Sequence, residues 1–452
     1  MTRLPRLGPS GVHTHGGPSP SSLLGRVILL CALGAVAIAT VVGLVALWPD
    51  AAKVAAVQAD TQYVIPDASF ESARVEAITE GCGTTAQGDT QISPGEGGVT
   101  ACETADVTIL TGPKAGQRTQ VHLGGPYAGA NISVGDRIEL LSVPQSGPNG
   151  ESGGTLESFF GVDRSQSLLV LLILFVMIVG LVAWLRGLLA LLALAFSGVM
   201  VVAFVLPAVI SGRPGLLVAL VAAAATMFVV LYVAHGPSIR TSTALAGTLC
   251  GVAITALVAQ LSIGAVRLSG YTDEASNVLS GLSGGFDFRG LLACGIVFAG
   301  LGVLNDVTIT QASAVWELRA AGPGLSRRQL FWSSMRIGRD HIASTIYTIV
   351  FAYVGTSLSV LLLLYLYDLP AAQLLTFEDL AAEVVMTLCS AIGLVLAVPL
   401  TSAIAVLLAA APRPGGAPPL EAPPSAPAPG ERRRRRAPAT PDELTRPLDW
   451  DF

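Results

Sequence analysis

Charged residues are scarce in this sequence. They make up 13% of its 452 residues, whereas a soluble domain carries about 25%. The interval 168–185 contains no charged residue at all, and an apolar run of about 20 residues is long enough to cross the hydrocarbon core as a helix. The composition therefore excludes a soluble globular protein and predicts an integral membrane protein.

The sequence also lacks the short motifs of common enzyme chemistry. It has no P-loop, no HExxH pair, no CxxC spacing and no basic, aromatic-interleaved face for nucleic acid. The segment 281–284 reads Gly-Leu-Ser-Gly and matches the Gly-x-Ser-Gly of intramembrane serine proteases. A Ser–His dyad needs a histidine on the same side of the membrane, and the predicted topology leaves only His122 there, inside a separate domain. We therefore expect no enzyme activity, no cofactor, no metal and no nucleic-acid partner.

Cysteines are few and fall into two groups. Cys82 and Cys102 lie in a polar, glycine-rich segment and enclose a short loop, so a disulfide is predicted if that segment is exported. Closing such a loop would contribute ~3 kcal/mol. The other four lie in apolar runs and are expected to be small buried side chains: Cys31, Cys250, Cys294 and Cys389.

The apolar runs divide the chain into a leader (1–26), a membrane anchor (27–48), an exported domain (60–150), a membrane domain (167–410) and a tail (411–452). A signal peptide cleaved after 57–59 is the alternative to the anchor, but the apolar run is longer than a usual signal core. The exported domain has short alternating segments between Gly, Pro and Ser clusters, which predicts about five antiparallel strands, with an OB-like barrel as their natural closure. The tail is rich in Pro, Ala and Gly and is predicted to be disordered. Its arginine run, 432–436, is read either as a contact with anionic lipid or as a solvated charge run.

Seven helices are predicted after the anchor, which gives an all-α polytopic bundle of about eight transmembrane helices. Threading the chain from an inside N-terminus leaves few arginines near the helices on the outside, namely Arg164, Arg213, Arg267 and Arg289. This predicts that both termini are cytoplasmic and the β domain extracytoplasmic. The 24 arginines against two lysines favour a GC-rich genome, so we expect a bacterial cytoplasmic membrane. The predicted helices are 167–185, 188–210, 216–234, 241–261, 288–308, 342–366 and 381–409, with a separate amphipathic interfacial helix at 326–335.

Ionisable residues inside membrane helices are costly and are functional candidates. Asp306, preceded by Asn305, lies on a stripe of small and polar residues at helical spacing. Arg339, in the segment Gly338-Arg339-Asp340, is the predicted charge partner of Asp306. Simple interfacial anchoring of these groups is the alternative. The stripe comprises Gly295, Ala299, Gly302, Asp306, Thr310, Ser313 and Glu317.

Glu383 is a third candidate, at the outer end of the last helix. An exposed carboxylate at the rim of the membrane is the favoured interpretation of this residue, and membership of the polar intramembrane cluster is the other. The predicted cluster comprises Asn305, Asp306, Gly338, Arg339, Asp340 and Glu383.

Two segments carry a resemblance to a known family. They are 299–308, Ala-Gly-Leu-Gly-Val-Leu-Asn-Asp-Val-Thr, and 335–340, Met-Arg-Ile-Gly-Arg-Asp, supported by 352–355, Glu383, Gly393 and 397–401. Over roughly 60–410 the chain resembles the YibE/F-like family of bacterial multipass membrane proteins. The resemblance implies a permease-like membrane protein with no established substrate. It also singles out Asp306, Gly338, Arg339, Asp340 and Glu383.

These patterns predict a membrane transporter or permease for an unknown small solute or ion. The alternative is a membrane scaffold or accessory subunit whose exported β domain recruits an envelope protein partner. Transporters usually contain internal repeats, and none is evident among the seven helices, which weighs against the first hypothesis. The lipid bilayer is an expected partner under either hypothesis, and a homo-oligomer is compatible with both.

Overall fold

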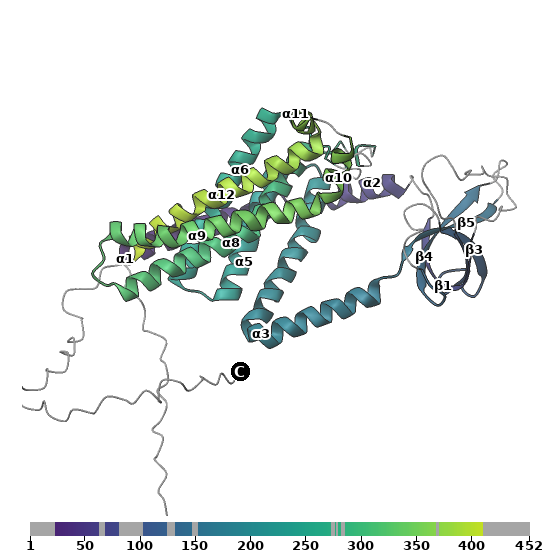
Figure 1. The fold of residues 1–452 in the computed structure, drawn as a ribbon, viewed down its shortest axis with the longest axis horizontal. Coiled ribbons are helices and arrows are strands. Elements are labelled where there is room, and N and C mark those ends of the chain that lie inside the picture. Colours follow the sequence, from purple (N-terminus) through teal and green to yellow (C-terminus); the bar gives the residue numbers. More distant parts are fainter. Residues whose placement is uncertain are drawn as a thin grey trace, which may run out of the picture. The chain divides into compact units, whose positions relative to one another are not determined.

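The computed structural model describes residues 23–62, 68–80, 103–123, 132–146, 152–272, 276, 279–281, 285–367 and 370–409. The predicted disulfide between Cys82 and Cys102, the leader and the arginine-containing tail lie outside these residues. The described part contains a helical bundle and a small antiparallel sheet (Figure 1).

Six helices of the described part are long and apolar enough to cross a membrane, or seven if the bent pair α9 and α10 is one span. They are α1 (Leu23–Ala46), the continuous run from α3 (Ser165–Met200) through the π-helical turn η2 (Val201–Val205) to α4 (Leu206–Ile210), α5 (Gly215–His235), α6 (Ile239–Val266), α8 (Phe288–Ala321) and α12 (Glu378–Leu408). The bent pair is α9 (Arg327–Thr356) and α10 (Leu358–Leu366), and the shorter helices are α2 (Ala51–Gln62) and α11 (Ala371–Leu374).

The run from Ser165 to Ile210 joins two helices that the sequence predicted separately. Its backbone breaks at Trp184, which has non-helical angles (φ 51°, ψ −144°), and the turn is visible in Figure 1. At 1.5 Å per residue, 46 residues extend about 69 Å, more than twice the ~30 Å hydrocarbon core. The prediction of eight separate spans is therefore not confirmed by the count of continuous helices.

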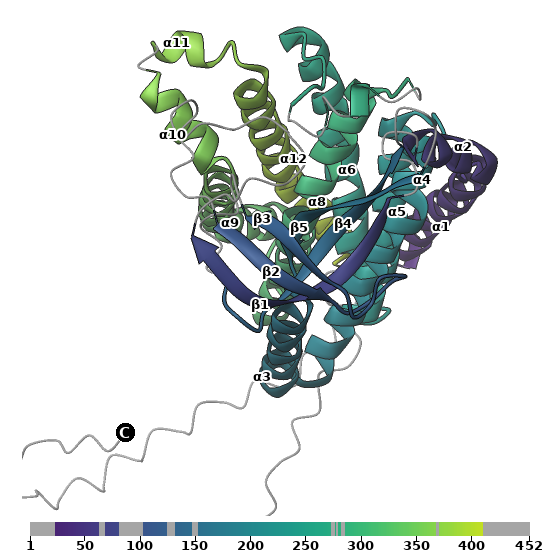
Figure 2. The ribbon, with the colours of Figure 1, turned by 90° about the vertical axis from the view of Figure 1, so that its right-hand side faces the viewer.

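The predicted interfacial helix at 326–335 is also part of a longer helix. Ser326 and Gln329 form a capping box, and α9 continues from there to Thr356 without a stop. The axis then bends by 64° into α10, and Figure 2 shows α10 leaving the direction of α9.

Close packing at glycines holds the centre of the bundle together. A Cβ on Gly251 of α6 would lie 2.8 Å from Leu304 of α8 and 3.0 Å from Ala397 of α12, so only glycine allows the three helices to approach this closely. The hydroxyls of Thr248 and Thr308 are 2.6 Å apart across α6 and α8. Figure 1 shows α8, α9 and α12 side by side.

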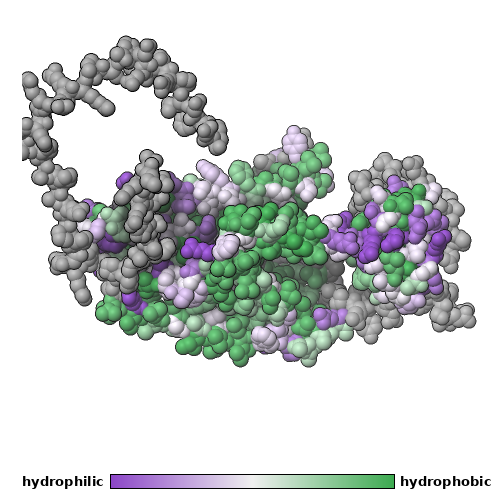
Figure 3. Space-filling view, turned by 90° about the horizontal axis from the view of Figure 1, so that it is seen from below, coloured by the Kyte–Doolittle hydropathy of each residue, from purple (hydrophilic) through white to green (hydrophobic). Residues whose placement is uncertain are grey.

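The face of the bundle seen in Figure 3 carries a broad apolar area. The most hydrophobic window of the Ser165–Ile210 run has no buried residue, and large side chains such as Leu181 are 80% exposed. Cys31 and Cys250 are exposed as well, so the prediction that all four cysteines of the apolar runs are buried holds only for Cys294 and Cys389. A surface of this kind is suited to lipid rather than to water.

The β domain is a five-stranded antiparallel sheet in the order β3-β2-β1-β4-β5. Alternate residues, among them Val75, Val107 and Ile138, point into its own small core. The strands are β1 (Ser69–Glu80), β2 (Glu103–Ile109), β3 (Arg118–Leu123), β4 (Arg137–Ser146) and β5 (Ser152–Val162).

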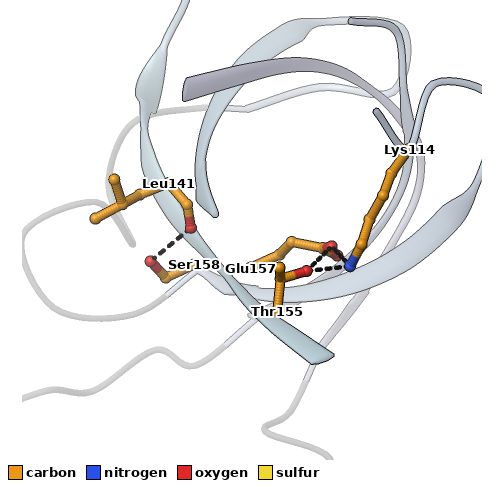
Figure 4. A network of polar contacts seen from close by, with 5 residues as sticks. All are labelled: Lys114, Leu141, Thr155, Glu157 and Ser158. Carbon is orange, nitrogen blue, oxygen red and sulfur yellow. Dashed lines mark hydrogen bonds and ion pairs between the residues drawn. The ribbon is translucent and has the colours of Figure 1, made fainter. Parts of the chain in front are cut away.

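The sheet curls into a partly open barrel, and polar contacts link its strands. Lys114, in the β2–β3 turn, donates to the Thr155 hydroxyl and forms an ion pair of 2.6 Å with Glu157, both on β5 (Figure 4). Ser158 donates to the Leu141 carbonyl at 3.4 Å, joining β5 to β4. The sequence predicted about five antiparallel strands, and this coarse prediction is confirmed.

Candidate functional site

The Gly-Arg-Asp segment of α9 is split between two environments. Gly338 is buried, and a Cβ there would lie 2.7 Å from Val398 on α12 and 3.0 Å from Gln311 on α8. Arg339 and Asp340 are exposed. Gly338 therefore serves the close packing of α9 against α8 and α12, while the two charges project away from that contact.

Asp306 is exposed on α8 and forms no ion pair in the described part of the chain. Arg339 has none there either, so the predicted Asp306–Arg339 pair is not formed. Asn305 is half-buried, and its side-chain oxygen is buried with no hydrogen-bond partner among the described residues.

The stripe on α8 lies partly along a cleft at one end of the bundle. Ile309, Ser313 and Glu317 follow Asp306 at three, seven and eleven residues, so all four share one helical face, and the last three line the cleft. Of the predicted stripe, Ser313 and Glu317 line this cleft, whereas Asp306 is not among its lining residues. We call this space the basic cleft; it is lined by Arg26, Leu30, Arg186, Tyr232, Ala234, His235, Pro237, Ser238, Ile239, Arg240, Thr241, Ser242, Ile309, Ser313, Trp316, Glu317 and Ala320.

Glu383 on α12 is half-buried rather than fully exposed at the rim. One of its carboxylate oxygens is buried and has no hydrogen-bond partner among the described residues. The carboxylate lies near Ser357, at the bend between α9 and α10. Tyr353, in the last turn of α9, is close enough to interact electrostatically with the carboxylate. A carboxylate of α12 therefore faces the break in a neighbouring span.

Glu378, one and a half turns before Glu383, has a different task. Its carboxylate accepts hydrogen bonds from the Ser269 amide and hydroxyl, both at 2.6 Å, and from the Gly270 amide at 2.8 Å. These hydrogen bonds connect the start of α12 to the loop after α6. Because they occupy the carboxylate, Glu378 has a structural role and is not available to bind a ligand.

A buried polar group that the sequence interpretation missed lies in the middle of the bundle. Gln311, 1% exposed, donates to the Ser334 carbonyl at 3.0 Å and to the Ser402 hydroxyl at 2.6 Å. Its own side-chain oxygen is buried and has no hydrogen-bond partner in the described part. Its sequence signal is an amide within an apolar helix, four residues after Val307. Because an amide carries no charge, a search for ionisable residues in membrane helices does not find it.

Among the described residues, no three His, Cys, Asp or Glu side chains come together in a way that could hold a metal ion. The arrangement instead combines apolar membrane-length helices, buried amide and hydroxyl groups, and a carboxylate at a broken span. These features define a multipass helical membrane protein with polar groups inside its bundle.

A comparison of the sequence with known families gives the particular assignment. The YibE/F-like protein family matches residues 171–411, more than half of the chain, and the chain belongs to this family. No curated protein and no solved structure matches it. The family resemblance seen in the sequence is therefore confirmed over residues 171–411.

Proposed function

We propose that this protein moves a small solute or ion across the membrane. The observation that supports the proposal is Glu383, whose buried, unpartnered carboxylate oxygen lies beside the bend between α9 and α10. Broken membrane helices that expose polar groups beside an intramembrane carboxylate are typical of transporter binding sites. Glu383 would bind the cation or proton, and Ser357 and Tyr353 would orient it.

We also propose a topology with eight spans. Arg213, just after α4, donates to the Trp48 carbonyl just after α1 at 3.3 Å, while Arg186 lines the basic cleft together with Arg26, near the start of α1. The segment from Arg186 to Arg213 thus runs parallel to α1 over the same depth. The 19 residues before Trp184 would form a separate span, and the positive-inside rule would put the β domain outside and both termini inside.

The proposal can be tested without knowing the solute in advance. The full-length protein is reconstituted into liposomes with an entrapped pH dye and an imposed membrane potential, and a panel of inorganic ions and small metabolites is added outside. Flux is expected in the wild type and is expected to be lost in Glu383→Gln. Asp340→Asn, which changes an exposed carboxylate on α9, is the matched control and should retain the flux. Absence of flux with every solute, or equal flux in Glu383→Gln, would remove the assignment.

A scaffold or accessory role is the second candidate, favoured by one feature of the β domain. Phe70 and Phe160 are 60% and 53% exposed and pack edge to face at 4.8 Å, and exposed aromatic pairs are common at protein interfaces. The antiparallel strand order, with β3 beside β5, fits the OB-like barrel that the sequence suggested. A photo-crosslinker at position 70 of the full-length chain that captures one envelope protein, with no flux in liposomes, would favour this role.

A further inference from the structure

The basic cleft is a space of about 1270 Å³ between α1, α3, α5, α6 and α8. It lies at the N-terminal end of α6, whereas Glu378 and its partners Ser269 and Gly270 lie beyond the C-terminal end of α6. The 28 residues of α6 span about 42 Å. The cleft is therefore remote from Glu383 and needs an explanation of its own.

Positive charge converges on the cleft from three separate helices. Arg26 comes from α1, Arg186 from α3 and Arg240 from α6, and His235 lines the same space. Among the described residues, Glu317 is the one carboxylate of the lining. It pairs with Arg240 at 3.2 Å, and the side chains of Glu317 and Arg240 are 70% and 41% exposed. Even with Arg26 left out of the count, Arg186 and Arg240 outnumber the one carboxylate of the described lining, which leaves an excess of positive charge.

Arg186 reaches the cleft because the helix breaks at Trp184, two residues earlier. Without the break, Arg186 would continue along a helix whose most apolar window contains no buried residue. The break that divides the Ser165–Ile210 run therefore also places the charged Arg186 side chain in the lining of the cleft.

Backbone and side-chain donors add to the charges. The N-terminus of α6 opens into the cleft, with Ser238 as its N-cap, and the positive end of a long helix dipole attracts anions. Trp316, only 2% exposed, also lines the cleft, and its indole N–H has no hydrogen-bond partner among the described residues. A buried donor without a partner costs about 1–3 kcal/mol, and an anion in the cleft would accept from it.

We propose that the basic cleft binds a phosphate-bearing anion. Arginine side chains match phosphate oxygens in bidentate geometry, so Arg186 and Arg240 would hold the phosphate between α3 and α6 with Trp316 as a further donor. The phosphate comes either from the headgroup of an anionic phospholipid or from a free phosphate compound. Glu317 competes with the anion for Arg240, so occupation of the site displaces this carboxylate.

Binding is measured on the full-length protein by two arms. In the first arm, inorganic phosphate is titrated calorimetrically into the protein in a neutral detergent. In the second, the protein is taken from vesicles of phosphatidylglycerol or of phosphatidylcholine, and native mass spectrometry counts the retained lipid. The variants are Arg186→Gln, Arg240→Gln and Glu317→Gln, with Arg213→Gln at the other end of the bundle as the matched control.

Each arginine variant of the cleft is expected to weaken binding roughly tenfold or more, the loss of one charge-assisted contact, while Arg213→Gln leaves it unchanged. Glu317→Gln is expected to tighten binding because the competing carboxylate is removed. Phosphate binding identifies a free anion, and retention of phosphatidylglycerol over phosphatidylcholine without phosphate binding identifies a lipid headgroup. Binding in neither arm, equal binding in the arginine variants or weaker binding in Glu317→Gln would overturn the proposal. None of these readouts depends on transport through Glu383.

Discussion

At the scale of single residues, the three segments singled out in the sequence have separate tasks. Gly338 is a packing residue, Asp306 continues the α8 face that lines the basic cleft, and Glu383 places a buried carboxylate oxygen at a helix break. The identity of these residues could be predicted because charge and glycine are rare in apolar helices. Their contacts could not, since the Asp306–Arg339 pairing depends on how α8 and α9 are rotated about their axes. The burial of Gly338 directs Arg339 away from the bundle centre.

Gly338→Ala is expected to destabilise the bundle by about 1–3 kcal/mol, the usual cost of overpacking. The new methyl group would meet Val398 at 2.7 Å and Gln311 at 3.0 Å, so α9 must move away from α8 and α12. Thermal unfolding in detergent measures the change. Gly302→Ala is the matched control, because a Cβ at Gly302 has no neighbour within 4 Å, and it should change stability little. An equal effect of both substitutions would contradict the packing role of Gly338.

Glu157 makes the stability of the β domain depend on pH. Burial alone would raise the pKa of this carboxyl, but hydrogen bonds from Lys114, Thr119 and Thr155 and the charge of Lys114 outweigh burial and lower the pKa below its ordinary value of 4.5. The unfolded chain then binds the proton more readily than the folded one. The stabilisation is therefore present above pH 4.5 and is lost as the pH falls through the lower pKa of the folded state.

The expected result is a lower melting temperature of the β domain in acid, followed by circular dichroism of the strand signal between pH 7 and pH 3. In Glu157→Gln the melting temperature at pH 7 should be lower and its dependence on pH smaller, because the variant carries no proton-binding group at this position. A variant with the same pH dependence as the wild type would show that the ion pair with Lys114 is not responsible.

At the scale of elements, the sequence located most of the apolar helices but not their continuity. The sequence predicts an interfacial helix at 326–335 and a membrane helix at 342–366, with the charges of 336–340 between them. Instead α9 runs through these charges, because Gly338 faces the bundle while its charged neighbours face outward. The break before Arg186 was foreseen within two residues, and its position at Trp184 depends on backbone angles that no side-chain pattern specifies. Helix boundaries inside apolar sequence are set by tertiary contacts rather than by local preference.

The break at Trp184 predicts that Arg164 and Arg213 lie on the same side of the membrane and Arg186 on the other. Single cysteines at 164, 186 and 213 are placed in a background without native cysteines, and a membrane-impermeant maleimide is applied to intact cells. Cysteines at 164 and 213 should react, and the cysteine at 186 should react only after permeabilisation. If 164 and 213 were labelled from opposite sides, the Ser165–Ile210 run would cross the membrane once.

At the scale of the whole molecule, composition alone predicted the class, and the match of residues 171–411 to the YibE/F-like protein family confirms the family. The scarcity of charged residues is a property of the whole sequence, so the class of protein can be predicted from it without knowing which residues are in contact. The basic cleft is the opposite case, because Arg26, Arg186 and Arg240 are about 50 to 200 residues apart and meet only in the folded bundle. No sequence pattern links these three arginines, and only the fold brings them to one cleft.

A series of substitutions at position 383 tests the transport proposal most directly. Flux in liposomes is measured for Glu383, Glu383→Asp and Glu383→Gln at matched protein density, and native insertion is checked by size-exclusion chromatography. The proposal predicts that the aspartate variant retains part of the flux, because a shorter carboxylate still lies near Ser357, whereas the glutamine variant has none. Equal flux from all three proteins would contradict a role for this carboxylate in moving the solute.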